Sequence, residues 1–315
     1  MATSKSGSKA STAKSSTKKT TSSASTKKVT QEAVVATKPK FAVKRPSFKK
    51  PTGEANYPAI ILAELVGTFV LTLVALLTLQ DTGALYVGLT VAVLILGVGA
   101  VSGAHLNPAV TFGLWSARKL NTVLVPVYWI SQFAGAAVAI LTLGLFGNGY
   151  SLDFTHFGAL HWGILGAEAL GTAVFLFGLV AAATNDKLSQ VGKAFGIGLA
   201  LTVGILVSSA GLTALQNNSY NEYSAKQQAT AQQTQNKEEQ SLPAELYVKG
   251  ATLNPAVALA STEYTENQVN RLPAGKDEAQ YSRLGLETIL GTLIGAAIGA
   301  NLYLFIAYVN RQQNA

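Results

Sequence analysis

The chain has 315 residues, of which 49% are hydrophobic and 13% charged, and an ordinary soluble domain has roughly a quarter of its residues charged. The formal net charge of +8 comes from one end, because residues 1–56 hold 13 lysines and arginines against Glu32 and Glu54. The lack of cysteine excludes disulfide and thiol chemistry. No nucleotide-binding loop, zinc motif or nucleophile triad occurs, so we expect no enzyme, no cofactor and no metal site.

Residues 1–56 form the first predicted segment, a disordered basic cytoplasmic arm. Its Ser, Thr and Lys content leaves too few apolar residues to form a core. It has no apolar run of the kind that marks a secretory signal peptide. A nucleic-acid-binding tail has the same composition. Because the arm is joined to a membrane body, we favour anionic lipid headgroups over nucleic acid as its partner.

Long apolar runs make up most of the remaining chain, and each is close to the ~20 residues that cross a bilayer. The six predicted spans are residues 58–79, 84–101, 123–146, 162–183, 194–210 and 285–309. Two further apolar stretches, 107–117 and 254–261, would reach only about half the hydrocarbon thickness as helices. The sequence therefore predicts an all-α membrane protein with six transmembrane helices and two half-helices.

Lysine and arginine in the short loops predict the orientation of these spans. Besides the basic arm, they are Arg118, Lys119, Lys187, Lys193 and Arg311, which all fall on one side of the predicted membrane. The loops at 80–83 and 147–161, on the other side, contain none. Cytoplasmic loops carry an excess of lysine and arginine, so both termini are predicted to be cytoplasmic.

The two halves of the chain resemble each other. LAELVGTFVLT at 62–72 recurs as GAEALGTAVFL at 166–176, which matches Glu64 with Glu168. Three spans in each half place the two copies in opposite orientations across the membrane. This is the inverted-repeat architecture of many membrane transport proteins.

The predicted channel domain covers residues 57–310, with a first repeat at 57–146 and a second at 162–310. The matched glutamate and asparagine are 43 residues apart in the first repeat and 86 apart in the second. The difference coincides with a polar tract that no bilayer core would hold. We therefore predict an extracellular polar insertion at about 211–249.

Both short apolar stretches begin with the tripeptide Asn-Pro-Ala, formed by Asn107, Pro108 and Ala109 and by Asn254, Pro255 and Ala256. Asn is a strong N-cap, Pro suits the first helical turn and Ala propagates a helix, so each motif predicts a helix start. Two starts at mid-depth would meet head to head and bring the positive ends of two helix dipoles together, which repels cations. The asparagine amide groups, free to donate, would orient a central water and interrupt a proton relay.

SGAHLNPAVT at 102–111, the second Asn-Pro-Ala, the repeated AExxGT and the six-plus-two layout resemble the major intrinsic protein family of aquaporins and glycerol facilitators. The resemblance implies a homotetramer in the plasma membrane, with one water pore per subunit. It also implies that buried Glu64 and Glu168 hold the two re-entrant loops. The backbone carbonyls that it implies along the pore belong to Gly103, Ala104, His105, Gly250, Ala251 and Thr252.

The family's usual filter is the main departure. The resemblance places the constriction at Val87, Ile205, Ala251 and Val257, which are all aliphatic. Family members usually have an arginine directly after the second Asn-Pro-Ala, where this chain has Val257. The loss predicts a wider and more apolar mouth. Lys249 either returns a cation to that mouth or ends the polar loop in solvent.

We therefore expect a passive channel for water that also leaks small uncharged solutes and excludes ions and protons. A first alternative is a pore that mainly serves glycerol, urea, ammonia or gas. An ion-coupled transporter is a second, although it would be expected to have further charged groups at mid-depth. A third is an adhesion or scaffold protein with a closed pore, whose contact surface is the insertion.

Overall fold

The structure is a computed structural model that describes residues 56–78, 83–148, 152–233, 241–270 and 280–313, which all belong to one compact unit, Arg45–Ala315. The predicted basic arm at 1–56 lies outside the described residues except for Asn56. The side chain of Asn56 caps helix α1 (Tyr57–Leu77) by accepting a hydrogen bond of 3.3 Å from the backbone N–H of Ala59.

Within the described ranges, six helices are long and apolar enough to cross a membrane, which confirms the predicted spans. They are α1, α2 (Gly83–Ser102), α4 (Leu124–Leu143), α5 (Trp162–Thr184), α6 (Gln190–Gln233) and α9 (Leu286–Gln313). The two half-helices are α3 (Pro108–Ser116) and α7 (Pro255–Ala260). Both begin at the proline of their Asn-Pro-Ala motif.

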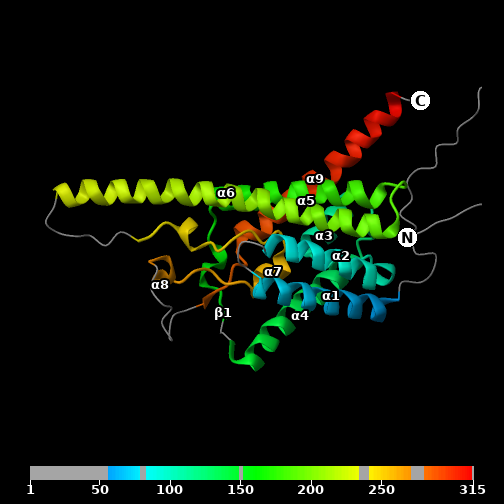
Figure 1. Cartoon of the computed structure of the whole chain (residues 1–315), viewed down its shortest axis with the longest axis horizontal. Helices are drawn as coiled ribbons and strands as arrows, with labels where there is room; N and C mark the ends of the chain where they lie inside the picture. Colours follow the sequence, from blue (N-terminus) through cyan, green and yellow to red (C-terminus); the bar gives the residue numbers. More distant parts are fainter. Residues whose placement is uncertain (1–55, 79–82, 149–151, 234–240, 271–279, 314–315) are drawn as a thin grey trace, which may run out of the picture. The chain divides into compact units, whose positions relative to one another are not determined.

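Helix α6 is much longer than the predicted fifth span at 194–210. It continues into the polar tract and has 44 residues, and Figure 1 shows it running past the end of α5. The predicted end was wrong because polarity alone does not stop a helix. Residues 212–233 contain neither Gly nor Pro and are rich in Ala and Gln, which favour helix. Leu212, in this extension, is still buried against Ile164 of α5.

Short elements connect the long helices. The π-helix η1 (Gly144–Asn148) extends α4, and the strands β1 (Leu152–Asp153) and β2 (Gln280–Tyr281) pair in parallel. The remaining short helices are η2 (Thr155–Gly158), η3 (Ala244–Tyr247) and α8 (Glu266–Val269). The strand pair fixes the loop before α9 against the loop before α5.

Glycines bring the long helices into close contact. Helix α5 packs along α6 and α9, and α1 packs along α2 and α4. A Cβ atom on Gly295 of α9 would lie 2.2 Å from the backbone oxygen of Ala169 on α5. In the first half, a Cβ atom on Gly135 of α4 would lie 2.4 Å from the backbone oxygen of Leu65 on α1. Such contacts replace the hydrophobic driving force that helices lack inside lipid.

The loops that enter the half-helices have an unfavourable backbone. Leu106 and Leu253, each just before its asparagine, have φ angles of 53° and 49°. A residue other than glycine in this left-handed region costs about 1–3 kcal/mol, so it persists only where its surroundings fix it. Two buried carboxylates fix the backbone at these leucines.

Glu64 of α1 is fully buried and holds the first loop. It accepts hydrogen bonds from the backbone N–H groups of Leu106 at 2.7 Å and His105 at 3.0 Å. The hydroxyl of Ser102 donates to it at 2.6 Å, and the amide of Gln132 at 2.8 Å. All of these donors are neutral.

Glu168 of α5 is also fully buried and holds the second loop. It accepts from the N–H of Leu253 at 3.0 Å, and from the N–H and hydroxyl of Thr252 at 3.1 and 3.2 Å. The guanidinium Nη2 of Arg283 lies 3.7 Å from its Oε1. In both halves, therefore, a buried glutamate accepts hydrogen bonds from the backbone of the loop. The second half differs because the cation of Arg283 lies beside the glutamate.

Gly295→Ala should lower the free energy of unfolding by about 1–3 kcal/mol, because the new Cβ has to push α5 and α9 apart. Gly166→Ala on α5 is the matched control, since an added Cβ meets nothing within 4 Å there. The control should be neutral or slightly stabilising. Thermal unfolding in one detergent measures both variants, and equal midpoints would contradict the described packing.

Glu64→Ala should lower the free energy of unfolding by at least about 2 kcal/mol, because the buried N–H groups of His105 and Leu106 lose their acceptor. Glu222→Ala, at an exposed position of α6, removes the same side chain without this loss and should be near neutral. Thermal unfolding monitored by circular dichroism gives the comparison. A Glu64→Ala midpoint equal to that of Glu222→Ala would show that the carboxylate does not hold the loop.

Candidate functional site

The asparagines of the two Asn-Pro-Ala motifs start the half-helices. Asn107 Oδ1 accepts a hydrogen bond from the backbone N–H of Ala109 at 2.7 Å, and Asn254 Oδ1 accepts one from Ala256 at 3.0 Å. Pro108 and Pro255 occupy the first helical positions, as their fixed φ angles favour. All six residues of the motifs are buried.

Each asparagine also binds the opposite loop. Asn107 Nδ2 donates to the backbone oxygen of Leu253 at 2.8 Å, and Asn254 Nδ2 donates to that of Leu106 at 3.0 Å. The two helix starts are thus joined with their N-termini toward each other. Each amide group was predicted to be free to donate, whereas one of its two N–H groups is used here. One N–H on each asparagine remains.

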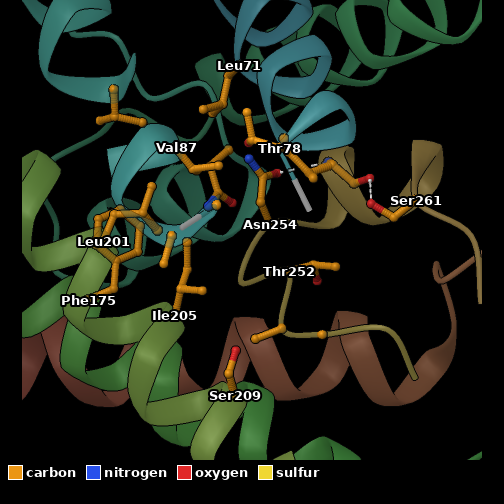
Figure 2. A pocket seen from close by; sticks show the side chains of 18 of the residues that line it. Leu71, Thr78, Val87, Phe175, Leu201, Ile205, Ser209, Thr252, Asn254 and Ser261 are labelled. Carbon is orange, nitrogen blue, oxygen red and sulfur yellow. Dashed lines mark hydrogen bonds between the residues drawn. The ribbon is translucent and has the colours of Figure 1, made fainter. Parts of the chain in front are cut away.

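Both asparagines line a cavity of about 390 Å³. Figure 2 shows Val87, Ile205 and Asn254 among the residues that surround it. It is lined by all four residues of the predicted constriction, Val87, Ile205, Ala251 and Val257, and also by Ala104, His105, Gly250 and Thr252. Gly103 has a φ of 87° and is not among the lining residues. The structure therefore brings the aliphatic residues and the asparagines to one continuous space.

His105 is fixed beside this cavity by two neighbours. Its Nδ1 lies 3.1 Å from the hydroxyl of Thr111, and its ring centre lies 4.4 Å from that of Tyr128. The hydroxyl of Tyr128 in turn donates to the backbone oxygen of Ser102. The histidine is therefore part of the hydrogen-bonded frame of the first loop.

Lys249 lines one end of the cavity and is half-buried rather than solvated. Its Nζ donates to the hydroxyl of Thr262 at 2.7 Å and lies 5.5 Å from the ring centre of Tyr264. Burial lowers the pKa of Lys249, while the nearby carboxylate of Glu263 acts in the opposite direction. A cation thus borders the end of the cavity that lies near the loop before α9.

Arg283 is the site residue that the sequence analysis missed. Only 2% of its surface is exposed, and it lines the same end of the cavity as Lys249. Its Nη1 donates to Glu287 Oε1 at 3.0 Å. The sequence held one signal for it. Glu287 lies inside the predicted sixth span, where a carboxylate needs a partner, and Arg283 precedes it by one helical turn.

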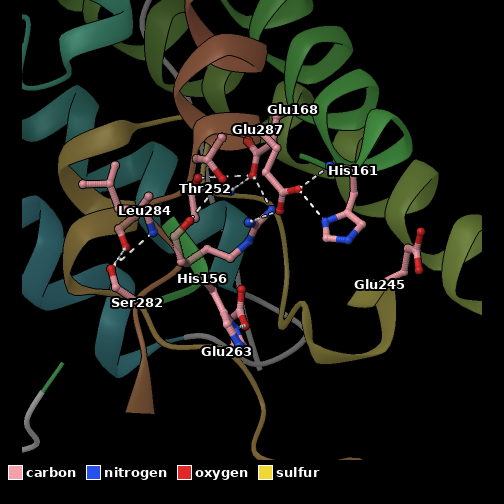
Figure 3. Close-up of polar contacts among 12 residues, drawn as sticks. His156, His161, Glu168, Glu245, Thr252, Glu263, Ser282, Leu284 and Glu287 are labelled. Atoms are coloured by element: carbon pink, nitrogen blue, oxygen red, sulfur yellow. Dashed lines mark hydrogen bonds and ion pairs between the residues drawn. The ribbon is translucent and has the colours of Figure 1, made fainter. Parts of the chain in front are cut away.

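A second cavity, of about 350 Å³, adjoins this arginine. It contains two histidine–glutamate pairs: His156 Nδ1 lies 3.1 Å from Glu263, and His161 Nδ1 lies 2.9 Å from Glu287 (Figure 3). In the part of the chain that the structure describes, no three or more His, Cys, Asp or Glu side chains gather as metal ligands. These pairs join the segment before α5 to the loop after α7 and to the first turn of α9.

Comparisons with known proteins identify the family. The family model described as "Major intrinsic protein" matches residues 54–221. Aquaporin Z of Photorhabdus laumondii is 34% identical over 175 residues, which are 47% of this chain and 75% of that protein. Aquaporin AqpM of Methanothermobacter thermautotrophicus is 33% identical over 133 residues, which are 39% of this chain and 52% of that protein.

Among solved structures, the aquaglyceroporin from Plasmodium falciparum is similar at 20% identity, with a TM-score of 0.46, over 78% of this chain and 93% of that one. The chain spans three quarters of aquaporin Z but only about half the length of AqpM and of the plant aquaporins it matches. The family model covers more than half of the chain. The chain therefore belongs to the major intrinsic protein family and is a multi-pass membrane channel protein, not an enzyme.

Proposed function

We propose that this chain forms a passive pore in the plasma membrane that conducts water and also passes small uncharged solutes. The observation that carries the proposal is the cavity that both Asn107 and Asn254 line. Each amide gives one hydrogen to the opposite loop and keeps a second N–H group. A water molecule between the asparagines would accept from both.

The same geometry supports the exclusion of ions and protons. The N-termini of α3 and α7 each contribute up to about half a positive charge, which opposes a cation at the meeting point. A water that accepts from both asparagines directs its own hydrogens away from them along the file. A chain of proton transfers would have to reverse direction there, which is a barrier of the kind that water pores use.

The lining of the constriction supports leakage of uncharged solutes. Val87, Ile205, Ala251 and Val257 offer only aliphatic side chains to the cavity. Such a ring provides no hydrogen bonds to replace the hydration shell of an ion, but it tolerates the carbon skeleton of a small solute. This lining also favours a second candidate function, a pore used mainly for glycerol, urea, ammonia or gas.

Orientation and assembly belong to the same proposal. The exposed Arg118 and Lys187, together with Lys193 in the first turn of α6, support cytoplasmic termini. Large apolar side chains cover the outer faces of the spans, as at Ile130 and Leu141 of α4, which suits contact with lipid or with neighbouring subunits. The homotetramer, and the contact of the 1–56 arm with anionic lipid, remain predictions.

Val87→Trp should bring the water permeability of proteoliposomes down toward that of protein-free vesicles, because an indole fills the cavity that Val87 lines. Val93→Trp on the same helix is the matched control, since Val93 is 64% exposed on the outer face. Stopped-flow light scattering under a sucrose gradient measures the rate. A wild-type rate equal to that of protein-free vesicles would reject the channel and favour the closed-pore scaffold.

Val257→Arg should reduce glycerol and urea permeation severalfold while water permeation persists, because it adds donors, a charge and side-chain volume to the wall of the cavity. Val257→Met adds length without charge and serves as the control. Stopped-flow traces with glycerol, urea and sucrose gradients separate the three permeabilities. Solute rates equal to those of the wild type in both variants would argue against Val257 as part of the constriction.

A further inference from the structure

The backbone of Arg283 is tied to the end of half-helix α7. Its N–H donates to the backbone oxygen of Ser261, the C-cap residue directly after α7, at 2.9 Å. The neighbouring Ser282 hydroxyl donates to the oxygen of Leu259 at 3.0 Å, and the hydroxyl of Thr288 donates to the oxygen of Arg283 at 3.1 Å. These bonds attach the segment that contains Arg283 to the end of α7, and they hold the arginine beside the cavity.

Among the described residues, Glu287 is the hydrogen-bond partner of the Arg283 guanidinium, while Glu168 lies at ion-pair distance. Glu287 accepts from Nη1 through Oε1, while its Oε2 accepts from the backbone N–H and the ring Nδ1 of His161, both at 2.9 Å. Glu287 thus has a fixed position. Nε and Nη2 of Arg283 are buried and have no hydrogen-bond partner among the described residues, and Nη2 reaches Glu168 only at 3.7 Å. Hydrogen-bond donors of a cavity-lining arginine are therefore left over.

The first half of the molecule shows that holding a loop does not require this cation. Glu64 holds its loop with the neutral donors of Ser102 and Gln132 and with backbone N–H groups. In both halves of the inverted repeat a buried glutamate holds the loop before the half-helix, and an arginine lies beside that glutamate in the second half. That arginine lines the cavity, and so does Lys249. Among the described residues that line the cavity, these two are the lysine and arginine side chains, and no Asp or Glu is with them.

We propose that Arg283 is a specificity-determining residue of the pore, an inference that rests on the channel function proposed above. Its positive charge opposes the entry of cations at this end. Its N–H groups bind the oxygen of water or of a small hydroxyl- or amide-bearing solute. Lys249 adds to the charge, whereas Val257, beside the second asparagine, supplies neither charge nor donor. Selectivity is thus supplied by the loop before α9.

The test is Arg283→Gln in full-length protein reconstituted into liposomes, with Arg311→Gln at the exposed end of α9 as the matched control. The neutral variant leaves Glu168 and Glu287 without a cation between them, so potassium leak should rise on the order of tenfold. Urea permeation should change relative to water, and water permeation should persist. The control should match the wild type in all three measurements.

Two further variants separate selectivity from folding. Arg283→Gln combined with Val257→Arg should restore low potassium leak, since the cation returns to the cavity from α7, whereas a purely structural defect would not be rescued. Arg283→Lys keeps a cation near both glutamates and remains informative if the glutamine variant fails to fold. It should exclude potassium but permeate urea differently, because it lacks the Nε donor.

The outcomes of the inference and of the proposed function are distinguishable. A wild type that conducts neither water nor urea above protein-free vesicles rejects the channel function. A wild type that conducts, with Arg283→Gln and Arg283→Lys both matching Arg311→Gln in potassium leak and urea permeation, rejects the role of Arg283 alone. A glutamine variant that leaks potassium but is not rescued by Val257→Arg also overturns it, because the effect is then structural.

Discussion

The hydrogen bonds between the two asparagines and the opposite loops are the constraint on which the rest of the structure depends. Asn107 reaches the oxygen of Leu253, and Asn254 reaches that of Leu106. These hydrogen bonds hold together two helix N-termini of like polarity, which face each other in a region that lacks bulk water. The left-handed backbone at both leucines turns the required oxygens toward the opposite asparagine. Glu64 and Glu168 then fix that backbone through its N–H groups.

The two halves share this frame but differ in charge. Neutral donors complete the first half, and Arg283 with its partner Glu287 completes the second. An inverted repeat has equivalent positions on opposite sides of the membrane, so a charge present in one copy only makes the ends of the pore chemically different. The paired asparagines and the residues that hold their loops lie where the repeat is kept, whereas the charge that distinguishes the two ends lies where it is broken.

The six spans and the two half-helix starts could be predicted from the sequence because their signals are local. Apolar runs of about 20 residues indicated the six spans, and Asn-Pro-Ala indicated the helix starts. The end of α6 was not predictable from polarity, because a helix stops at a cap or a breaker and the tract to Gln233 has none. The partner of each asparagine amide depends on how the halves dock. Arg283 was missed for a similar reason. Its place beside the cavity follows from the hydrogen bond to Ser261, and the spacing of the two residues in the sequence does not predict that bond.

The unbroken course of α6 couples two distant parts of the molecule. Ile205 in the cavity wall and Gln233 at the helix end belong to one rigid rod, and the stretch between them is about 40 Å long. No loop lies between the two points to absorb a displacement. A tilt or twist of the polar end of α6 would therefore also move Ile205 in the wall of the cavity.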